Sequence, residues 1–223
     1  MTITHPLTTI TAVLCAHTAA AREPEHPGTG PIQGSVRIVL DGLICEDGRE
    51  ERYSDPDRAL LHYAFDHYAA WRRRLPACAA LLSGPGAFSE NLSSLGITEN
   101  TLCIGDVLKV GAATVQVTSG RIACSTMNGR FGSDRMAPTM HRLSRTGWFY
   151  RVLGEGDVRS GDALFLLERP NPRWSIARVG AAIYRGEMDP EALETLAGLK
   201  GMSSEWRQLF EQRGTTGALE GTY

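Results

Sequence analysis

The stretch GRIACSTMNGRFG, residues 120–132, brings one thiol and two guanidinium groups close together in the chain. Cys124 stands between Arg121 and Arg130, with small polar residues and two glycines after it. A thiolate is both a nucleophile and a soft metal ligand, and neighbouring guanidinium groups favour it over the thiol. The residues alone leave two interpretations open. Cys124 is a reactive or metal-binding group, or it is a small side chain buried in the core, as free cysteines often are.

The other cysteines show no shared framework. The chain has five cysteines, which is an odd number, and it contains no Cys-x-x-Cys pair and no Cys/His cluster. This pattern disfavours a disulfide-stapled fold and a structural zinc site. We therefore expect the remaining four to be packing or incidental residues, namely Cys15, Cys45, Cys78 and Cys103.

The charge balance excludes one class of partner. The 223 residues carry a formal net charge of −2, which gives no electrostatic basis for binding nucleic acid. The chain has two lysines, Lys109 and Lys200, so arginine supplies nearly all of its 23 positive charges. Arginine binds phosphate and carboxylate groups through a planar fork, although a compositional bias is the simpler explanation of the excess.

The N-terminal sequence MTITHPLTTITAVLCAHTAAAREPEHPG lacks the basic start and the sustained apolar run of a secretory signal peptide. No apolar run in the chain approaches the length of a membrane span. We therefore expect a soluble protein of the reducing cytoplasm with no membrane partner. Whether it acts as a monomer or as a homodimer stays open.

Two strands and one helix are predicted in the first third of the chain. Residues 7–15 are rich in β-branched side chains, and 35–40 form the second predicted strand. Asp55 followed by Pro56 is typical of a helix start, and apolar residues then recur at steps of three and four. This spacing predicts a helix over 56–75 outside the sheet. Its apolar positions are Leu61, Ala64, Tyr68, Trp71 and Leu75.

From residue 88 onward the pattern changes to short strands. A Gly-Ala turn joins 101–111 to 114–119, which predicts a hairpin, and further strands are expected at 148–153 and 163–169. Helical spacing appears between them at Met136, Met140 and Leu143. Several short strands with one or two helices predict a closed or nearly closed β-barrel.

The last part of the chain has helical patterning. Three short helices are predicted over 171–185, 189–199 and 203–213, after a boundary at the RPNP sequence. We therefore expect a mostly β protein with helices, of the α+β class. Its predicted parts are an N-terminal strand and loop over 1–30, a barrel domain over 31–169 and a helical extension over 170–223.

Several blocks in this order resemble the MOSC domain family, and more narrowly its YiiM-like branch. They are FSENL (88–92), LGITENTLCIGDVLKVG (95–111), RIACSTMN (121–128), GWFYRVL (147–153), VRSGDALFLLER (158–169), PDRALLHYAFDHYAAW (56–71) and SSEWRQLFEQR (203–213). Together they cover roughly residues 34–213. The resemblance implies a MOSC-type β-barrel and a C-terminal three-helix appendage.

The resemblance also implies a function. Members of this family hold a molybdenum cofactor, a pterin-bound Mo, and reduce N-hydroxylated compounds such as hydroxylaminopurines and hydroxylamines with electrons from a separate redox partner. The family's metal-ligating cysteine falls on Cys124, which is therefore the expected catalytic and metal-binding residue. Tyr53 is expected on the substrate side. The expected cofactor-binding residues are Arg121, Asn91, Asn128, Arg130 and Arg151.

One block departs from the YiiM-like pattern, which usually reads Lys-x-His-Gly-Gly-Pro-Asp. The aligned stretch here is ERYSDPDRAL, residues 51–60, in which Pro56 and Asp57 remain and Tyr53 replaces the histidine. The usual glycine before Glu-Asn-Leu is Ser89, and the usual Pro-Arg-Ser-Pro-Cys reads Gly-Arg-Ile-Ala-Cys. The two glycines of the block are replaced by Ser54 and Asp55.

These departures keep other functions open. Glu51 and Asp55 would bring negative charge toward an anionic pterin phosphate, so we expect altered cofactor retention. One alternative is a cofactor-free descendant in which Cys124 acts on a small molecule, for example in a biosynthetic pathway, or carries sulfur as a persulfide. Another is a non-catalytic module whose three-helix tail binds a partner through an exposed apolar stripe.

Overall fold

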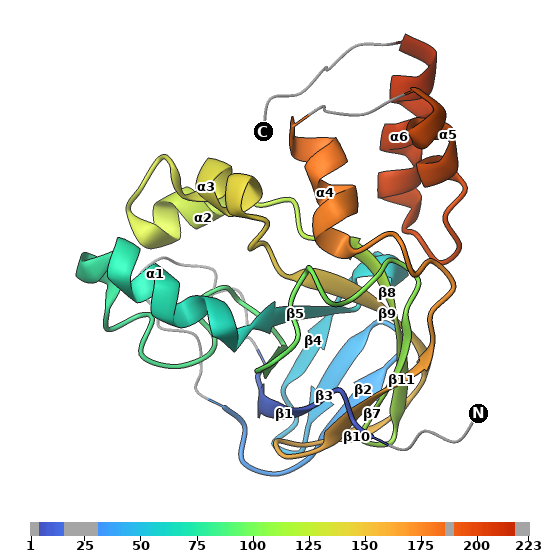
Figure 1. Ribbon diagram of the computed structural model, residues 1–223. Coiled ribbons are helices and arrows are strands. Elements are labelled where there is room, and N and C mark those ends of the chain that lie inside the picture. Colours follow the sequence, from blue (N-terminus) through green and yellow to red (C-terminus); the bar gives the residue numbers. More distant parts are fainter. Residues whose placement is uncertain (1–4, 16–30, 186–189, 217–223) are drawn as a thin grey trace.

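The computed structural model describes residues 5–15, 31–185 and 190–216 (Figure 1). Its centre is a closed β-barrel of seven strands in the order β1-β11-β7-β8-β9-β5-β6. Neighbouring strands are antiparallel except for the parallel pair β5 and β6. The strands are β1 (Thr8–Val13), β5 (Leu60–Ala64), β6 (Leu92–Ser94), β7 (Val107–Val110), β8 (Ala113–Gly120), β9 (Trp148–Gly154) and β11 (Ala163–Glu168).

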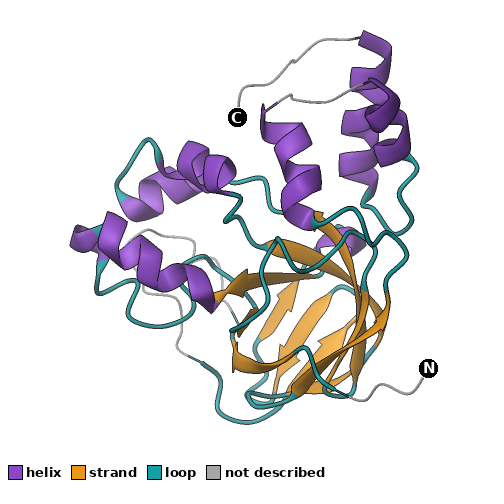
Figure 2. Ribbon diagram, in the orientation of Figure 1, coloured by secondary structure: helices purple, strands orange, loops and turns teal. Residues whose placement is uncertain are grey.

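A second, four-stranded sheet in the order β10-β2-β3-β4 accompanies the barrel. It carries the charged segment that leads into the candidate site, because β4 ends directly before Tyr53. Its strands are β2 (Val36–Val39), β3 (Gly42–Cys45), β4 (Glu50–Arg52) and β10 (Gly156–Val158). Figure 2 shows the strands gathered in one body and the helices outside it.

The helices form two groups, which lie on different sides of the barrel in Figure 1. The first group is α1 (Tyr68–Arg74), α2 (Ser125–Phe131) and α3 (Met136–Leu143). The second is the C-terminal group α4 (Ile176–Arg185), α5 (Pro190–Ala197) and α6 (Ser204–Thr216). Short 3-10 helices occur at Pro56–Arg58, Phe65–His67 and Pro76–Cys78. No helix in the described ranges is long and apolar enough to cross a bilayer.

Two hydrophobic cores hold these layers together. The first fills the barrel and extends into the C-terminal helices, where Trp206 and Phe210 are buried. The second lies beneath α1, α2 and α3 and contains Trp71, Phe88 and Met140. Burial of side chains of this size contributes about 1.5–3 kcal/mol each. The tail therefore shares its core with the barrel.

The structure confirms the α+β class, the barrel and the C-terminal helical extension. The predicted hairpin is β7–β8, and the helical spacing around Met140 corresponds to α3. The first predicted strand, assigned to a separate N-terminal segment, is β1. It pairs with both β11 and β6 and so completes the barrel.

The helix predicted over 56–75 is wrong for most of its length. Residues Leu60–Ala64 form β5, which lies between β9 and β6, and α1 begins at Tyr68. His62, which falls within the range predicted as helix, lies in this strand. All five residues of β5 are buried, so the strand lacks the polar alternation of a half-exposed strand. The buried residues of β5 therefore fall by chance at steps of three and four that continue the helical spacing of α1, and the two segments read as one helix.

Candidate functional site

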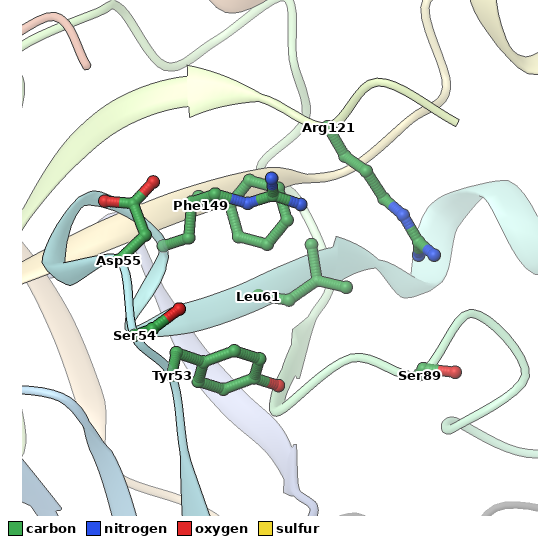
Figure 3. Close-up of a pocket in the computed structure, with 8 residues that line it drawn as sticks. Tyr53, Ser54, Asp55, Leu61, Ser89, Arg121 and Phe149 are labelled. Carbon is green, nitrogen blue, oxygen red and sulfur yellow. The ribbon is translucent and has the colours of Figure 1, made fainter. Parts of the chain in front are cut away.

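A pocket of about 280 Å³ opens where the segment after β4 meets the end of β8 and the start of β9 (Figure 3). Tyr53, Ser54 and Asp55 follow one another along one side of it, and Arg121 reaches in from another. The hydroxyl and carboxylate groups of the first side and the guanidinium of Arg121 therefore come from segments far apart in the sequence. The full lining is Tyr53, Ser54, Asp55, Arg58, Leu61, Ser89, Arg121 and Phe149.

Arg121 is fixed at its backbone and partly open at its side chain. Its N–H donates to the carbonyl of Gly147 over 3.0 Å, and its carbonyl accepts a 2.9 Å hydrogen bond from the Tyr184 hydroxyl of α4. Its guanidinium Nη1 donates to the Phe88 carbonyl over 2.5 Å, which is its one hydrogen-bond acceptor within the described residues. Burial lowers the pKa of Arg121, since the charged form loses water. An anion in the pocket would compensate for that loss.

A second guanidinium lies at the same pocket. Arg58 follows Asp57 at the end of the 3-10 helix, and its Cζ stands 4.6 Å from the centre of the Phe149 ring. Its exposed ion pair with Glu205 is long, at 3.9 Å, and contributes little. Sequence reasoning did not select Arg58 or Phe149, because neither belongs to a motif and only the fold brings them together.

The third charge of the pocket is negative. The Asp55 carboxylate accepts a 2.9 Å hydrogen bond from the backbone N–H of Asp57 and so caps the short helix that carries Arg58. Its side chain therefore has a structural role as well as a place in the pocket lining. A carboxylate here opposes the binding of a phosphate and favours groups that donate hydrogen bonds.

Cys124 is exposed and occupies the N-cap position of α2. The Thr126 hydroxyl makes the largest contribution to lowering the pKa of its thiol, and the backbone N–H groups of Thr126 and Met127 and the charge of Arg121 act in the same direction. The exposed position rules out the buried-thiol interpretation. Cys124 is not part of the pocket lining, but it is close enough to Arg121 for the two charges to interact.

The remaining cysteines differ from Cys124. Cys15, Cys45 and Cys103 are buried and Cys78 is half-buried, as expected for packing residues. Burial raises the pKa of the Cys103 thiol and raises that of Cys15 to about 12. No group of three or more His, Cys, Asp or Glu side chains that could hold a metal ion occurs within the described ranges.

Tyr53, Glu51 and Asn91 form one hydrogen-bonded unit. The Tyr53 hydroxyl donates to Oε1 of Glu51, and Nδ2 of Asn91 donates to Oε2 over 3.0 Å. Asn91 Oδ1 accepts the backbone N–H of Leu61 over 2.8 Å. Asn91 therefore fixes β5 and the Glu51 carboxylate, and Tyr53 alone of the three lines the pocket. Burial raises the pKa of Tyr53, so its hydroxyl stays protonated near neutral pH.

Three other expected site residues lie outside the pocket lining. Asn128 Oδ1 accepts the backbone N–H of Ala137 over 2.9 Å and joins α2 to α3. Arg130 Nη2 donates to the Gly86 carbonyl over 3.2 Å, while its buried Nε has no partner within the described residues. Arg151 is engaged by Asp57, with 2.7 Å between Nε and Oδ1, and by Gln116 over 3.2 Å.

Two carboxylates that the sequence analysis did not select shape the site. Buried Glu90 accepts hydrogen bonds from the Tyr68 hydroxyl (2.5 Å) and from the backbone N–H groups of Gly86 (2.8 Å) and Phe88 (3.0 Å). It thereby fixes the loop that carries Ser89 and the acceptor for Arg121. The second carboxylate is that of Asp57. The sequence could have indicated its importance, because Asp57 is retained in a block that is otherwise altered.

Comparisons with known proteins agree with this architecture. Residues 49–165 match the model of the MOSC domain, and residues 174–213 match that of the YiiM-like, 3-alpha helix domain. The chain is 30% identical to Protein YiiM of Escherichia coli (strain K12) over 190 residues, which are 85% of this chain and 84% of that protein.

Two further similarities extend this result. A protein named Reductase from Gibberella moniliformis is 34% identical over 151 residues, which cover 67% of this chain and 27% of that longer protein. The crystal structure of YiiM from Escherichia coli superposes with a TM-score of 0.80 at 27% identity, covering 96% of each chain.

Proposed function

The chain belongs to the MOSC domain family and carries the YiiM-like three-helix domain, and on this premise we propose that it is a molybdenum cofactor-dependent reductase of N-hydroxylated small molecules. The reaction is R–NHOH plus two electrons and two protons, giving R–NH₂ and water. The observation that carries the proposal is the exposed Cys124 thiol, with its lowered pKa, beside the pocket-lining guanidinium of Arg121.

The residues present fit such a cofactor. Cys124 offers a soft thiolate donor to a transition metal, which is the ligand type that such a centre requires. Arg121 has guanidinium N–H groups left over after its bond to Phe88, and these suit a phosphate oxygen. Arg58 adds a second cation at the same pocket. When bound, the cofactor would supply the two-electron redox chemistry, while the protein positions it and the substrate.

The substrate side of the proposal rests on the other wall of the pocket. Tyr53, Ser54 and Asp55 provide hydroxyl and carboxylate groups, and Leu61 and Phe149 provide apolar surface. A small planar ring that carries an N–OH group presents both an apolar face and hydrogen-bond donors. The Asp55 carboxylate accepts from such donors, and the apolar part of the lining suits the face of the ring.

The direct test is metal and pterin analysis after expression in a host that makes the cofactor. We expect bound Mo in the unaltered protein and background Mo in Cys124→Ser, with Cys78→Ser as the control at a half-buried cysteine. The same three proteins should be given hydroxylaminopurine and reduced methyl viologen, and the amine product measured. Absence of both Mo and product from the unaltered protein would overturn the proposal.

A second candidate, a cofactor-free protein in which Cys124 carries sulfur, is favoured by the same exposed thiol. A low-pKa, accessible cysteine is the type that forms a persulfide. Mass spectrometry after incubation with a persulfide donor distinguishes the two candidates. A Mo-free protein that gains one sulfur atom at Cys124 and not at Cys78 would support the sulfur carrier and exclude the reductase.

The third alternative, a partner-binding tail, required an exposed apolar stripe on the C-terminal helices. The large apolar side chains Val179, Ile183, Trp206 and Phe210 are instead buried in the core shared with the barrel. The exposed large hydrophobic residues of the described chain lie elsewhere, at Leu7, Leu40, Leu95 and Leu153. The basis for that alternative is therefore missing from the described part of the tail.

A further inference from the structure

A second concave surface, separate from the pocket described above, lies between the end of α1 and the start of α3. We call it the arginine groove. It has a volume of about 590 Å³ and shares no lining residue with the first pocket. Trp71 and Met136 form part of its floor, and Arg74, Arg135 and Arg142 stand around it. Figure 1 shows α1 and α3 on the same side of the barrel, next to α2.

The three guanidinium groups of the groove have no carboxylate partner within the described residues. Seven other arginines of the described chain form ion pairs, including Arg151 with Asp57. Arg74, Arg135 and Arg142 are exposed and make none. The local sequence is also basic, because residues 121–145 contain five arginines and one carboxylate, that of Asp134. This excess is local, since the whole chain has a net charge of −2.

The floor of the groove is rigid. Trp71 is fully buried, and its indole N–H donates to the Tyr63 hydroxyl over 2.7 Å. Met136 and Met140 are also buried in the second core. Because Trp71 and Met136 are buried, they fix the shape of the groove, and the contacts with a partner fall to the exposed arginines, a residue type that is enriched at protein interfaces. Three unpaired cations around one surface also repel one another, and an acidic partner would remove that repulsion.

The groove lies close to the candidate thiol. Cys124 caps the start of α2, and Ser133, which lines the groove, follows two residues after the end of that helix. The seven residues of α2 span about 10 Å at 1.5 Å per residue. The same core joins the two sites, because Phe88, whose carbonyl accepts from Arg121, packs against Phe131 at the end of α2 with 5.1 Å between ring centres.

We propose that the arginine groove docks the acidic face of the protein that delivers electrons to the site. This inference rests on the proposed function, since the reduction of R–NHOH to R–NH₂ and water consumes two electrons. A reduced flavin protein would supply these two electrons and become oxidised, and the two protons would come from solvent. The groove brings such a donor to within about one short helix of Cys124.

The test uses reduced flavodoxin, a small acidic FMN protein, as the donor. The groove variant is Arg74→Gln, Arg135→Gln and Arg142→Gln combined. The control is Arg37→Gln, Arg159→Gln and Arg173→Gln, which removes the same charge from exposed arginines outside the groove. At low ionic strength, kcat/KM for flavodoxin should fall about tenfold in the groove variant and less than about twofold in the control. Reduced methyl viologen should serve all three proteins equally, which shows that the site is intact.

Four further outcomes decide the proposal. Replacing the same three arginines with lysine should restore most of the flavodoxin rate, since steering depends on charge. Equal flavodoxin rates in the groove and control variants would overturn the proposal even if reduction with methyl viologen is efficient. If no donor supports reduction, the proposed function fails. Calorimetric titration with flavodoxin then tests docking by itself. Equal affinity of the unaltered protein and the groove variant for flavodoxin would overturn the docking proposal. Stoichiometric binding of citrate in the groove, with none of flavodoxin, would make it a small-anion site and refute protein docking.

Discussion

The carboxylate of Asp57 accepts a 2.9 Å hydrogen bond from the backbone N–H of Ser204, at the first turn of α6. The other carboxylate oxygen accepts a hydrogen bond from the Arg151 guanidinium. The backbone carbonyl of Asp57 accepts a 2.6 Å hydrogen bond from the Thr118 hydroxyl of β8. Because Asp57 lies between Asp55 and Arg58, which both line the pocket, the C-terminal helix is tied directly to the pocket wall. The appended domain therefore contributes to the shape of the site.

Asp57→Asn should lower the free energy of unfolding by about 2–3 kcal/mol, because Arg151 then loses its charged partner while partly buried. Urea unfolding measures this value. Glu205→Gln is the matched control, since it removes only the exposed 3.9 Å pair with Arg58 and should cost less than about 0.5 kcal/mol. Similar losses in the two variants would show that Asp57 has no special role in joining α6 to the pocket.

Ser89 adopts a backbone φ of 59°, in the left-handed region that favours glycine, and it stands where the YiiM-like branch usually has glycine. Ser89→Gly should therefore raise the free energy of unfolding by about 0.5 kcal/mol, since relief of strain slightly exceeds the entropy cost of glycine. Ser89→Val, which is β-branched, should lower it. Thermal unfolding of the three proteins checks the order, and a glycine variant less stable than the valine variant would contradict it.

The reactivity of Cys124 should depend on Thr126. The Thr126 hydroxyl and backbone N–H lower the pKa of the thiol, whereas burial raises the pKa of Cys103. At pH 7, an alkylating reagent should therefore label Cys124 faster than Cys103, and Thr126→Val should slow labelling of Cys124 severalfold. Thr139→Val is a control on α3. A rate unchanged by Thr126→Val at every pH between 6 and 9 would exclude this contact as the cause.

Buried histidines should make the fold sensitive to mild acid. Burial lowers the pKa of His62 to about 3 and of His141 to about 4, below the value of about 6.5 in an unfolded chain. The unfolded chain therefore binds protons first as the pH falls below about 6.5, and stability declines by up to about 1.4 kcal/mol per pH unit for each histidine until the folded-state pKa is reached.

His62→Gln should reduce that slope between pH 6.5 and 4.5, as measured by urea unfolding at several pH values. His62 bonds to Ser94 over 2.8 Å and to Tyr150 over 3.2 Å, so the variant will also be less stable at pH 7. The comparison therefore concerns the slope and not the absolute stability. Parallel pH profiles for the unaltered and variant proteins would show that His62 is not kept neutral by the fold.

The success and failure of sequence reasoning have physical causes. The barrel could be expected because short strands and turn residues are local signals, and α3 followed from its own apolar spacing. β5 was missed because a strand buried on both faces has no alternation, so its apolar run joined that of α1. A strand of this type is identified by its neighbours in the barrel, which lie far away in the sequence.

The candidate site divides in the same way. Of the residues expected at the site, Arg121 and Tyr53 line the pocket, whereas Arg151 faces Asp57, a partner 94 positions away. The side-chain oxygens of Asn128 and Asn91 accept hydrogen bonds from backbone N–H groups of neighbouring elements. Contacts between residues so far apart in the sequence depend on closure of the barrel, so no local sequence pattern predicts them.

The last prediction concerns cofactor retention in the altered block. Restoring the family block by Glu51→Lys, Tyr53→His, Ser54→Gly and Asp55→Gly should raise Mo occupancy. The two carboxylates of the block have different surroundings. Glu51 is hydrogen-bonded to Tyr53 and Asn91. The Asp55 side chain lines the pocket together with Arg58 and Arg121. Asp55 is therefore the residue whose charge most directly opposes a phosphate.

Asp55→Ser removes that charge and keeps a side-chain acceptor for the cap on Asp57 N–H, so the fold should change little. A charge-assisted phosphate contact contributes about 1.5–3 kcal/mol, so even partial relief of the repulsion should raise Mo per chain measurably at limiting cofactor. Asp66→Asn, which removes a carboxylate outside the pocket lining, is the control. Full Mo occupancy in the unaltered protein, or an equal gain in the Asp66 control, would show that the Asp55 carboxylate does not limit cofactor binding.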